Sequence, residues 1–164
     1  MQRFPSQNLR TPGPTPVPSD IVEAMTNPMI NHRGPEFDTL LNKATEQLKQ
    51  VFMTKNDLFI LTASGTGSLE ASIVNTLSPG DRVIAATAGA FGDRFVDMVE
   101  AYGADVKRMD FDWGGPIDPD DIRKALQAGP DIKAVLVTHN ETSTGVTHPV
   151  EDIAKVVKLS LIHI

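Results

Sequence analysis

Short apolar runs and amphipathic segments alternate along this chain from about residue 57 to residue 158. The apolar runs predict strands over residues 57–63, 81–87, 104–111 and 132–139. The amphipathic segments predict helices over residues 68–77, 90–101, 119–129 and 148–158. Alternation at this spacing implies right-handed crossovers between parallel strands. The sequence therefore predicts an α/β fold with a mostly parallel sheet and helices on both faces.

The chain before residue 57 lacks this alternation. Prolines at positions 12, 14, 16 and 18 fix φ and remove backbone donors, so residues 1–18 are expected to form an extended arm. Composition alone is equally compatible with a loose leader. Helices are predicted over residues 20–27, which Pro28 ends, and over residues 37–52, where apolar residues recur at helical spacing after Pro35.

Composition narrows the class of partner. The 164 residues carry a formal net charge of −6 without a run of lysine or arginine, which argues against a nucleic-acid or acidic-membrane partner. Cysteine is absent, which excludes disulfides and a cysteine nucleophile. The apolar stretches fall short of the roughly 20 residues that a membrane helix needs. A cytoplasmic protein that acts on small molecules is the expectation.

Unusual residues follow three of the predicted strands. The chain reads "TASGTGS" after the first, "TAGAFGDR" after the second and "THNETSTG" after the fourth. Ligands of parallel α/β sheets bind beyond the carboxyl ends of the strands. We therefore expect the three loops to converge on one rim.

The first loop has the composition of a phosphate-binding turn. Gly65 and Gly67 let an anion approach the backbone, while Ser64 and Thr66 add hydroxyl donors at the start of a helix. The alternative is an ordinary tight turn in which Thr66 or Ser68 caps the helix. The turn lacks the lysine of a triphosphate loop and the glycine spacing of a dinucleotide fingerprint, which leaves a single small phosphate.

The other two loops offer an aromatic ring and polar groups. Phe91 stands among small residues and is suited to stack on a heteroaromatic ring, although it could equally be a core residue together with Phe95. Residues 140–144 ("NETST") either cap the next segment or touch a ligand, and Gly145 permits the turn. Histidines 32, 139, 148 and 163 are not spaced as metal ligands, so no metal site is predicted.

Together the motifs resemble one family. The chain contains, in order, "TPGPTPVP", "HRGPEF", "SGTGSLEA", "AFGDRF", "THNETSTGV" and "HPVEDIA". This order resembles the amino-terminal part of the class V, fold-type I pyridoxal-phosphate aminotransferases, in particular the alanine–glyoxylate and serine–glyoxylate (serine–pyruvate) group. The resemblance extends to about Lys158. It implies that residues 19–158 are part of the large domain that binds pyridoxal 5'-phosphate.

The resemblance assigns roles to matching residues. It implies that Gly65 and Thr66 bind the cofactor phosphate, with Ser64 supporting the turn, and that Phe91 stacks on the pyridine ring. Thr142 matches the hydroxyl residue near the phenolic oxygen of the ring and the substrate carboxylate. Gly13 matches the arm that lines the substrate entrance, which favours an ordered arm.

The same resemblance implies that this chain has no complete catalytic set. The family's Schiff-base lysine, the acid that protonates the pyridine nitrogen and the arginine that holds the substrate carboxylate all lie beyond the "NETSTG" loop. No lysine here matches, so we expect no catalytic residue in this chain and an inactive fragment. Residues 159–164 ("LSLIHI") read as the translation of a sequencing-library adapter end, and we expect them to be non-native.

The sequence therefore predicts part of a homodimeric transaminase that moves an amino group from alanine or serine to glyoxylate or a related 2-oxo acid. Two alternatives stay open. One is a lyase or cysteine-desulfurase-like member of the same fold, and the other is a small non-enzymatic phosphate-binding α/β module.

Overall fold

The computed structural model describes residues 9–129 and 131–160. The chain divides into two compact units, Met1–Thr62 (the N-terminal unit) and Ala63–Ile164 (the α/β unit). Residues 1–8 of the predicted arm and 161–164 of the predicted non-native tail lie outside the described residues. The predicted domain boundaries at residues 18 and 158 stay predictions. None of the helices in the described part of the chain is long and apolar enough to cross a membrane.

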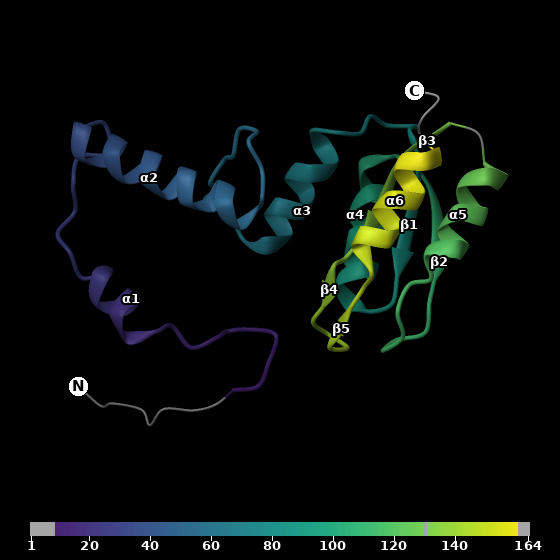
Figure 1. Ribbon diagram of the computed structural model, residues 1–164, viewed down its shortest axis with the longest axis horizontal. Helices are drawn as coiled ribbons and strands as arrows, with labels where there is room; N and C mark the ends of the chain where they lie inside the picture. The colour runs from purple at the N-terminus through teal and green to yellow at the C-terminus, as the bar shows by residue number, and fades with distance from the viewer. Residues whose placement is uncertain (1–8, 130, 161–164) are drawn as a thin grey trace. The chain divides into compact units, whose positions relative to one another are not determined.

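The N-terminal unit contains two helices after the proline-rich arm. Residues 9–18 form neither helix nor strand, as the prolines predict. Helix α1 (Ser19–Ala24) is shorter than predicted, because the side chains of Thr26 and Asn27 donate to the carbonyls of Glu23 and Ala24 and close its end. Helix α2 (Pro35–Val51; Figure 1) confirms the longer prediction. Pro35 stands in its first turn.

The strand predicted over residues 57–63 is wrong. These residues have no regular secondary structure, and Phe59, Ile60 and Leu61 expose 81%, 52% and 51% of their surface. An apolar run has the propensity for a strand, but a strand also needs a neighbour to pair its backbone groups. Among the described residues no strand pairs with this segment.

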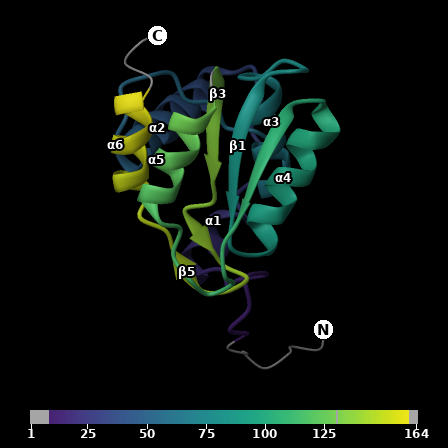
Figure 2. The ribbon, with the colours of Figure 1, turned by 90° about the vertical axis from the view of Figure 1, so that its right-hand side faces the viewer.

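The α/β unit is built on a three-stranded parallel sheet. Strands β1 (Arg82–Thr87), β2 (Asp105–Asp110) and β3 (Ile132–Val137) confirm the other three predicted strands, and their order is β2-β1-β3 (Figure 2). Helix α4 (Ala90–Tyr102) connects β1 to β2, and α5 (Pro119–Ala128) connects β2 back to β3 on the far side of β1. Strand β1 is therefore central, and its residues after Arg82 are all buried.

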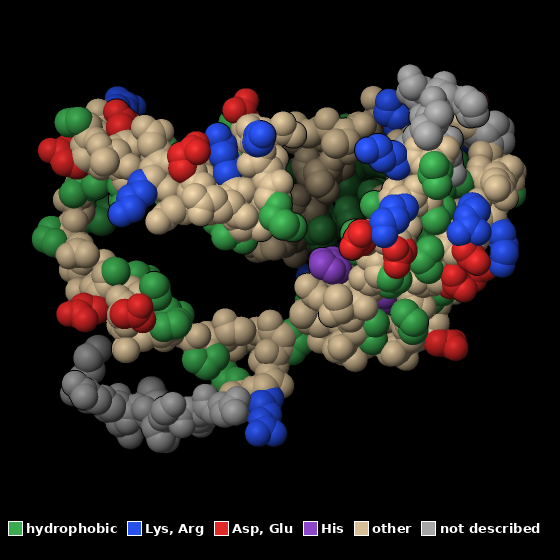
Figure 3. All heavy atoms as spheres, in the orientation of Figure 1, with side chains coloured by type: hydrophobic (Ala, Val, Ile, Leu, Met, Phe, Trp, Pro, Cys, Tyr) green, Lys and Arg blue, Asp and Glu red, His purple; other side chains and the backbone are tan. Residues whose placement is uncertain are grey.

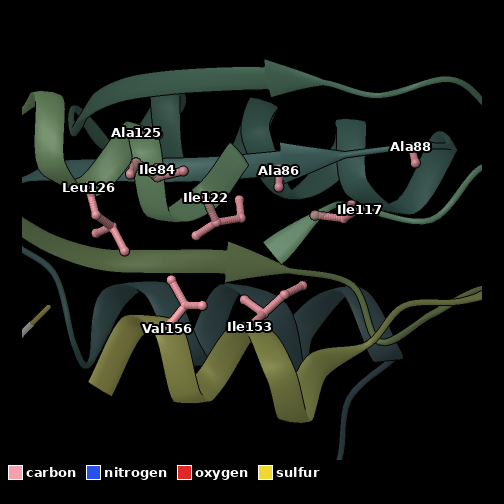
Figure 4. Packing of buried hydrophobic residues seen from close by; sticks show 9 residues of the cluster. All are labelled: Ile84, Ala86, Ala88, Ile117, Ile122, Ala125, Leu126, Ile153 and Val156. Atoms are coloured by element: carbon pink, nitrogen blue, oxygen red, sulfur yellow. The ribbon is translucent and has the colours of Figure 1, made fainter. Parts of the chain in front are cut away.

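Alternate residues of β1 pack on opposite faces of the sheet, as period-two side chains must. Ile84 and Ala86 belong to a core with α5 and with α6 (Val150–Ser160), as the labelled side chains of Figure 4 show. Val83 belongs to a second core with α3 (Gly65–Val74) and α4. Figure 2 shows α5 and α6 on one side of the strands and α4 on the other. Helices cover both faces, and the predicted fold class is confirmed.

The outer surfaces of α5 and α6 are charged in both signs. Asp120 pairs with Arg123 and Asp121 with Lys124 on α5, and Lys155 pairs with two carboxylates on α6. Figure 3 shows acidic and basic side chains interspersed on this face. The acidic start of α5 is thus a solvated helix end with Asp118 as its cap, where the helix dipole favours negative charge.

The connections place a switch point between β1 and β3. The helix after β1, α4, lies on one face of the sheet, whereas the helix that follows β3, α6, lies on the other. Where successive connections leave in opposite directions, a crevice opens beyond the carboxyl ends of the two strands. That crevice is where a ligand site is expected.

Candidate functional site

The three loops singled out in the sequence meet at this crevice, as predicted. A pocket of about 500 Å³ lies there. Its walls come from the first turns of α3 and α4 and from the chain after β3: Gly65, Thr66, Leu69, Phe91, Arg94, Phe95, Val137, Thr138, His139, Asn140 and Thr142. The pocket therefore includes four of the predicted site residues, namely Gly65, Thr66, Phe91 and Thr142.

The N-terminus of α3 has unpaired backbone donors. Ser64 is its cap, because the side chain of Ser64 accepts a bond of 3.3 Å from the N–H of Gly67, so neither Thr66 nor Ser68 plays that part. The backbone N–H groups of Gly65 and Thr66 have no acceptor among the described residues. A Cβ built on Gly65 would meet no described atom within 4 Å. This helix end can accept an anion from the pocket.

The N-terminus of α4 is closed by the protein itself. The buried carboxylate of Glu141 accepts bonds from the N–H groups of Phe91 (3.3 Å) and Gly92 (2.9 Å). The N–H of Ala90 donates to the hydroxyl of Ser143 at 3.0 Å. All three first-turn donors of α4 are thus satisfied, so this helix end is not free to bind an anion.

Glu141 is held as a carboxylate. Burial alone would raise its pKa, but bonds from the Ser143 hydroxyl and from the N–H groups of Gly92, Phe91 and Ser143 outweigh burial and lower the pKa. The carboxylate therefore stays charged at neutral pH. It lies where the α4 dipole favours a negative charge.

A short hairpin carries Glu141 and Thr142 to this position. Strands β4 (Asn140–Glu141) and β5 (Val146–Thr147) pair antiparallel, and the turn between them needs a positive φ, which Gly145 supplies at +76°. Residues 142–145 form the turn, so Thr142 is exposed at the pocket while its neighbour Glu141 is buried. The sequence predicted a polar loop here, but neither the hairpin nor its attachment to α4.

Two glycines allow the close approach of these segments. A Cβ on Gly89 would come within 2.5 Å of Glu141 Cγ and within 2.6 Å of Ser143 Oγ. A Cβ on Gly92 would come within 2.5 Å of the hydroxyl of Thr87, which donates to Asp93 at 2.8 Å. Larger residues at either position would push α4 away from β1 or from the hairpin.

Arg94 is a pocket residue that the sequence reasoning missed. Its Nη1 donates to the hydroxyl of Thr66 at 3.2 Å, and its Cζ lies 5.1 Å from the centre of the Phe91 ring. Residues three apart share one face of a helix, so the spacing from Phe91 to Arg94 was the available signal. That signal points to a neighbour of the aromatic but not to Thr66.

The remaining residues from the sequence analysis belong to the other unit or have a structural role. Gly13 belongs to the arm of the N-terminal unit, and its role at a substrate entrance stays a prediction. His148 is buried, and its Nδ1 accepts a bond of 3.2 Å from the N–H of Ile117. In the described part of the chain, no three ionisable side chains come together as metal ligands.

The comparisons with known proteins agree with this geometry. The family model described as aminotransferase class-V matches residues 8–163. The serine–glyoxylate aminotransferase of Methylorubrum extorquens is 40% identical over 159 residues, which are 94% of this chain and 40% of that protein. The L-aspartate–glyoxylate aminotransferase of Paracoccus denitrificans is 43% identical over 145 residues, 86% of this chain and 37% of that protein.

A solved structure shares the fold. The alanine–glyoxylate aminotransferase of Nostoc sp. superposes with a TM-score of 0.88 at 34% identity, over 97% of this chain and 42% of that one. The chain thus spans about 40% of the length of the relatives it matches. The order of its motifs, its sheet and the family match lead to one conclusion: this chain belongs to the class-V aminotransferase family.

Proposed function

We propose that this chain supplies the cofactor-phosphate site of a pyridoxal-phosphate-dependent transaminase. The enzyme would move an amino group from a small amino acid, such as alanine or serine, to glyoxylate or a related 2-oxo acid. The observation that carries the proposal is the pocket at the switch point, which joins a helix start with unpaired N–H groups, an aromatic ring and a hydroxyl. The three relatives described above all name glyoxylate, with different amino partners.

The pocket residues fit pyridoxal phosphate. A volume of about 500 Å³ lies within the range of small-molecule sites. Gly65 leaves space at the start of α3, where a side chain would intrude on a phosphate. The hydroxyl oxygen of Thr138, buried at the pocket wall, has no partner among the described residues. The site thus offers unsatisfied polar groups beside an aromatic face.

Each residue has a defined task in this proposal. The N–H groups of Gly65 and Thr66 would hold the phosphate, while Ser64 keeps the helix start in shape through Gly67. Phe91 would present its ring to the pyridine, and Thr142 would donate to its phenolic oxygen or to the substrate carboxylate. When bound, the cofactor supplies the carbonyl carbon that exchanges the amino group and a ring that accepts electrons.

The proton-transfer group is proposed to come from outside residues 9–160. Lys155 pairs with Glu151 and Asp152 on α6, and none of the described residues that line the pocket is a lysine. The residues described here would therefore bind and orient, with Gly13 proposed to line the substrate entrance. A homodimeric and cytoplasmic enzyme is part of the same proposal.

Expression of the complete coding sequence from the source locus tests the function. Glycine formation from glyoxylate should be measured with alanine, serine and aspartate as donors. We expect turnover with at least one donor, and a loss of about 2- to 12-fold in kcat/KM for Phe91→Ala, since a stacked ring contributes roughly 0.5–1.5 kcal/mol. Trp113→Ala, an exposed aromatic outside the pocket, is the matched control.

The rival functions give different products. Release of sulfide from cysteine, or of ammonia from an amino acid without glycine formation, would replace the proposal with a lyase. Phosphate binding without any turnover of the complete protein would replace it with a non-enzymatic module.

A further inference from the structure

Arg94 reaches across the pocket from α4 to α3. Its guanidinium bonds to Thr66 at the start of α3 and lies over the ring of Phe91, and all three residues line the pocket. A guanidinium has five N–H donors in a fixed fork. The guanidinium forms only one bond with the described residues, to Thr66, so its other N–H groups are available to a ligand.

The charge of Arg94 is not neutralised by an ion pair. The other arginines of the α/β unit each pair with a carboxylate: Arg82 with Asp105, Arg108 with Asp93 and Asp110, and Arg123 with Asp120. Among the described residues Arg94 has no such partner; it contacts a hydroxyl and an aromatic face instead. A full positive charge therefore lies beside the unpaired N–H groups of α3.

The buried carboxylate of Glu141 accepts its hydrogen bonds from the first turn of α4 and from Ser143, and it forms no ion pair with Arg94. The α3 side of the pocket thus combines a helix dipole with a guanidinium, and both attract an anion.

We propose that Arg94 is a positioning residue for the phosphate at Gly65 and Thr66. By donating to the Thr66 oxygen, Arg94 leaves the hydroxyl hydrogen free to point at the phosphate, and it adds its charge to the cradle. The inference rests on the proposed function, because it assigns a second charge-bearing residue to that same phosphate site.

Binding of pyridoxamine 5'-phosphate to the full 164-residue chain tests the proposal. This probe has no aldehyde and cannot form adducts with surface lysines, and pyridoxamine is the matched ligand without phosphate. We expect Arg94→Gln to weaken binding of the phosphate form about 10-fold, as for one lost charge-assisted bond, and to change binding of pyridoxamine less than 2-fold. The affinity of Arg94→Lys for pyridoxamine 5'-phosphate should fall between those of the parent chain and Arg94→Gln. Lysine keeps the positive charge but loses the paired N–H donors of the guanidinium. Arg123→Gln, which breaks a surface pair on α5, should bind as the parent does.

The pH dependence of binding distinguishes an electrostatic role of Arg94 from a purely structural one. A phosphate monoester gains its second charge near pH 6, so an adjacent guanidinium should strengthen binding as pH rises from about 5 to 7.5. We expect this rise to be flatter in Arg94→Gln. His139 is the other ionisable side chain among the described lining residues, so His139→Gln is measured in parallel. A purely structural role of Arg94 would weaken binding equally at every pH.

The outcomes distinguish the two proposals. Equal losses for pyridoxamine and its phosphate, or no loss in Arg94→Gln, would overturn the role of Arg94. The role of Arg94 would also be overturned if the parent chain bound neither pyridoxamine 5'-phosphate nor phenyl phosphate. If phenyl phosphate binds as tightly as pyridoxamine 5'-phosphate and Arg94→Gln weakens both, the role of Arg94 is supported while the proposed function loses its support.

Discussion

Two helices begin at the same rim of the sheet, and their N-termini differ in one respect. The first turn of α4 donates to Glu141 and Ser143, whereas the N–H groups of Gly65 and Thr66 at α3 have no acceptor among the described residues. Both starts are rich in glycine and small residues, so they look alike in the sequence. The difference depends on a carboxylate that comes from a hairpin about 50 positions later in the chain.

This difference determines where an anion can bind. A helix end that already holds a buried carboxylate repels a second negative charge, while an end with unpaired donors and a neighbouring guanidinium attracts one. The capped N-terminus of α4 therefore connects the helix that carries Phe91 to the hairpin that carries Thr142. The end of α3 keeps two N–H groups without an acceptor among the described residues, so it can still accept an anion.

Removal of the carboxylate should have the largest effect. Glu141→Ala leaves the N–H groups of Phe91 and Gly92 buried without an acceptor, and we expect it to lower the free energy of unfolding by about 2–3 kcal/mol. Urea denaturation followed by circular dichroism measures this loss. Glu100→Ala, an exposed glutamate on the same helix, is the control. Equal stability of the two variants would show that α4 does not need its cap.

A matched pair of glycine substitutions tests the comparison directly. Gly89→Ala places a methyl group against Glu141 and Ser143, and we expect a loss of about 1–3 kcal/mol from this overpacking. Gly65→Ala meets no described atom and should instead raise stability by about 0.4–1 kcal/mol, because alanine restricts the unfolded chain. It should weaken binding of pyridoxamine 5'-phosphate, since the methyl group occupies the approach to α3. Thermal melts and the binding assay above give both numbers. The opposite order of stabilities would contradict the two assignments.

Protonation of His148 at acid pH should destabilise the hairpin that caps the N-terminus of α4. The backbone N–H of His148 donates to the carbonyl of His139 at 2.8 Å at the base of the hairpin, and its side-chain Nδ1 accepts from the N–H of Ile117 at 3.2 Å, a bond that protonation of Nδ1 breaks. Burial lowers the pKa of His148; the charge of Glu141 opposes this shift and His139 adds to it. The unfolded chain therefore binds the proton more readily, so this contribution to stability is complete above the unfolded pKa of about 6.5 and is lost as pH falls.

We expect His148→Asn to flatten the loss of stability between pH 7 and pH 5, by at most about 1.4 kcal/mol per pH unit for one proton. The asparagine oxygen can still accept from Ile117 but does not titrate in this range. Denaturation curves at three pH values measure the slope. Exposed His139, changed to glutamine, should leave most of the slope in place, and an unchanged slope in His148→Asn would rule out this origin.

The sequence predicted the local elements well and the long-range side-chain contacts poorly. The hydrophobic periodicity and the turn residues predicted α2, three of the strands and the rim where the loops converge. These features follow from residues that are close together in the sequence. The strand predicted over residues 57–63 is wrong, because a strand needs a neighbouring strand and this pairing is not encoded locally. The bond from α4 to Glu141 joins residues about 50 positions apart, and the bond from Arg94 to Thr66 joins residues 28 positions apart. Neither contact could be predicted from the spacing of residues in the sequence.

The described residues that line the pocket all come from one continuous stretch, residues 65–142. The capped N-terminus of α4, the unpaired donors at the start of α3 and the guanidinium of Arg94 add only the neighbouring Ser64 and Ser143 to that stretch. Substitutions confined to residues 1–62, or to the chain after Gly145, therefore change none of these residues.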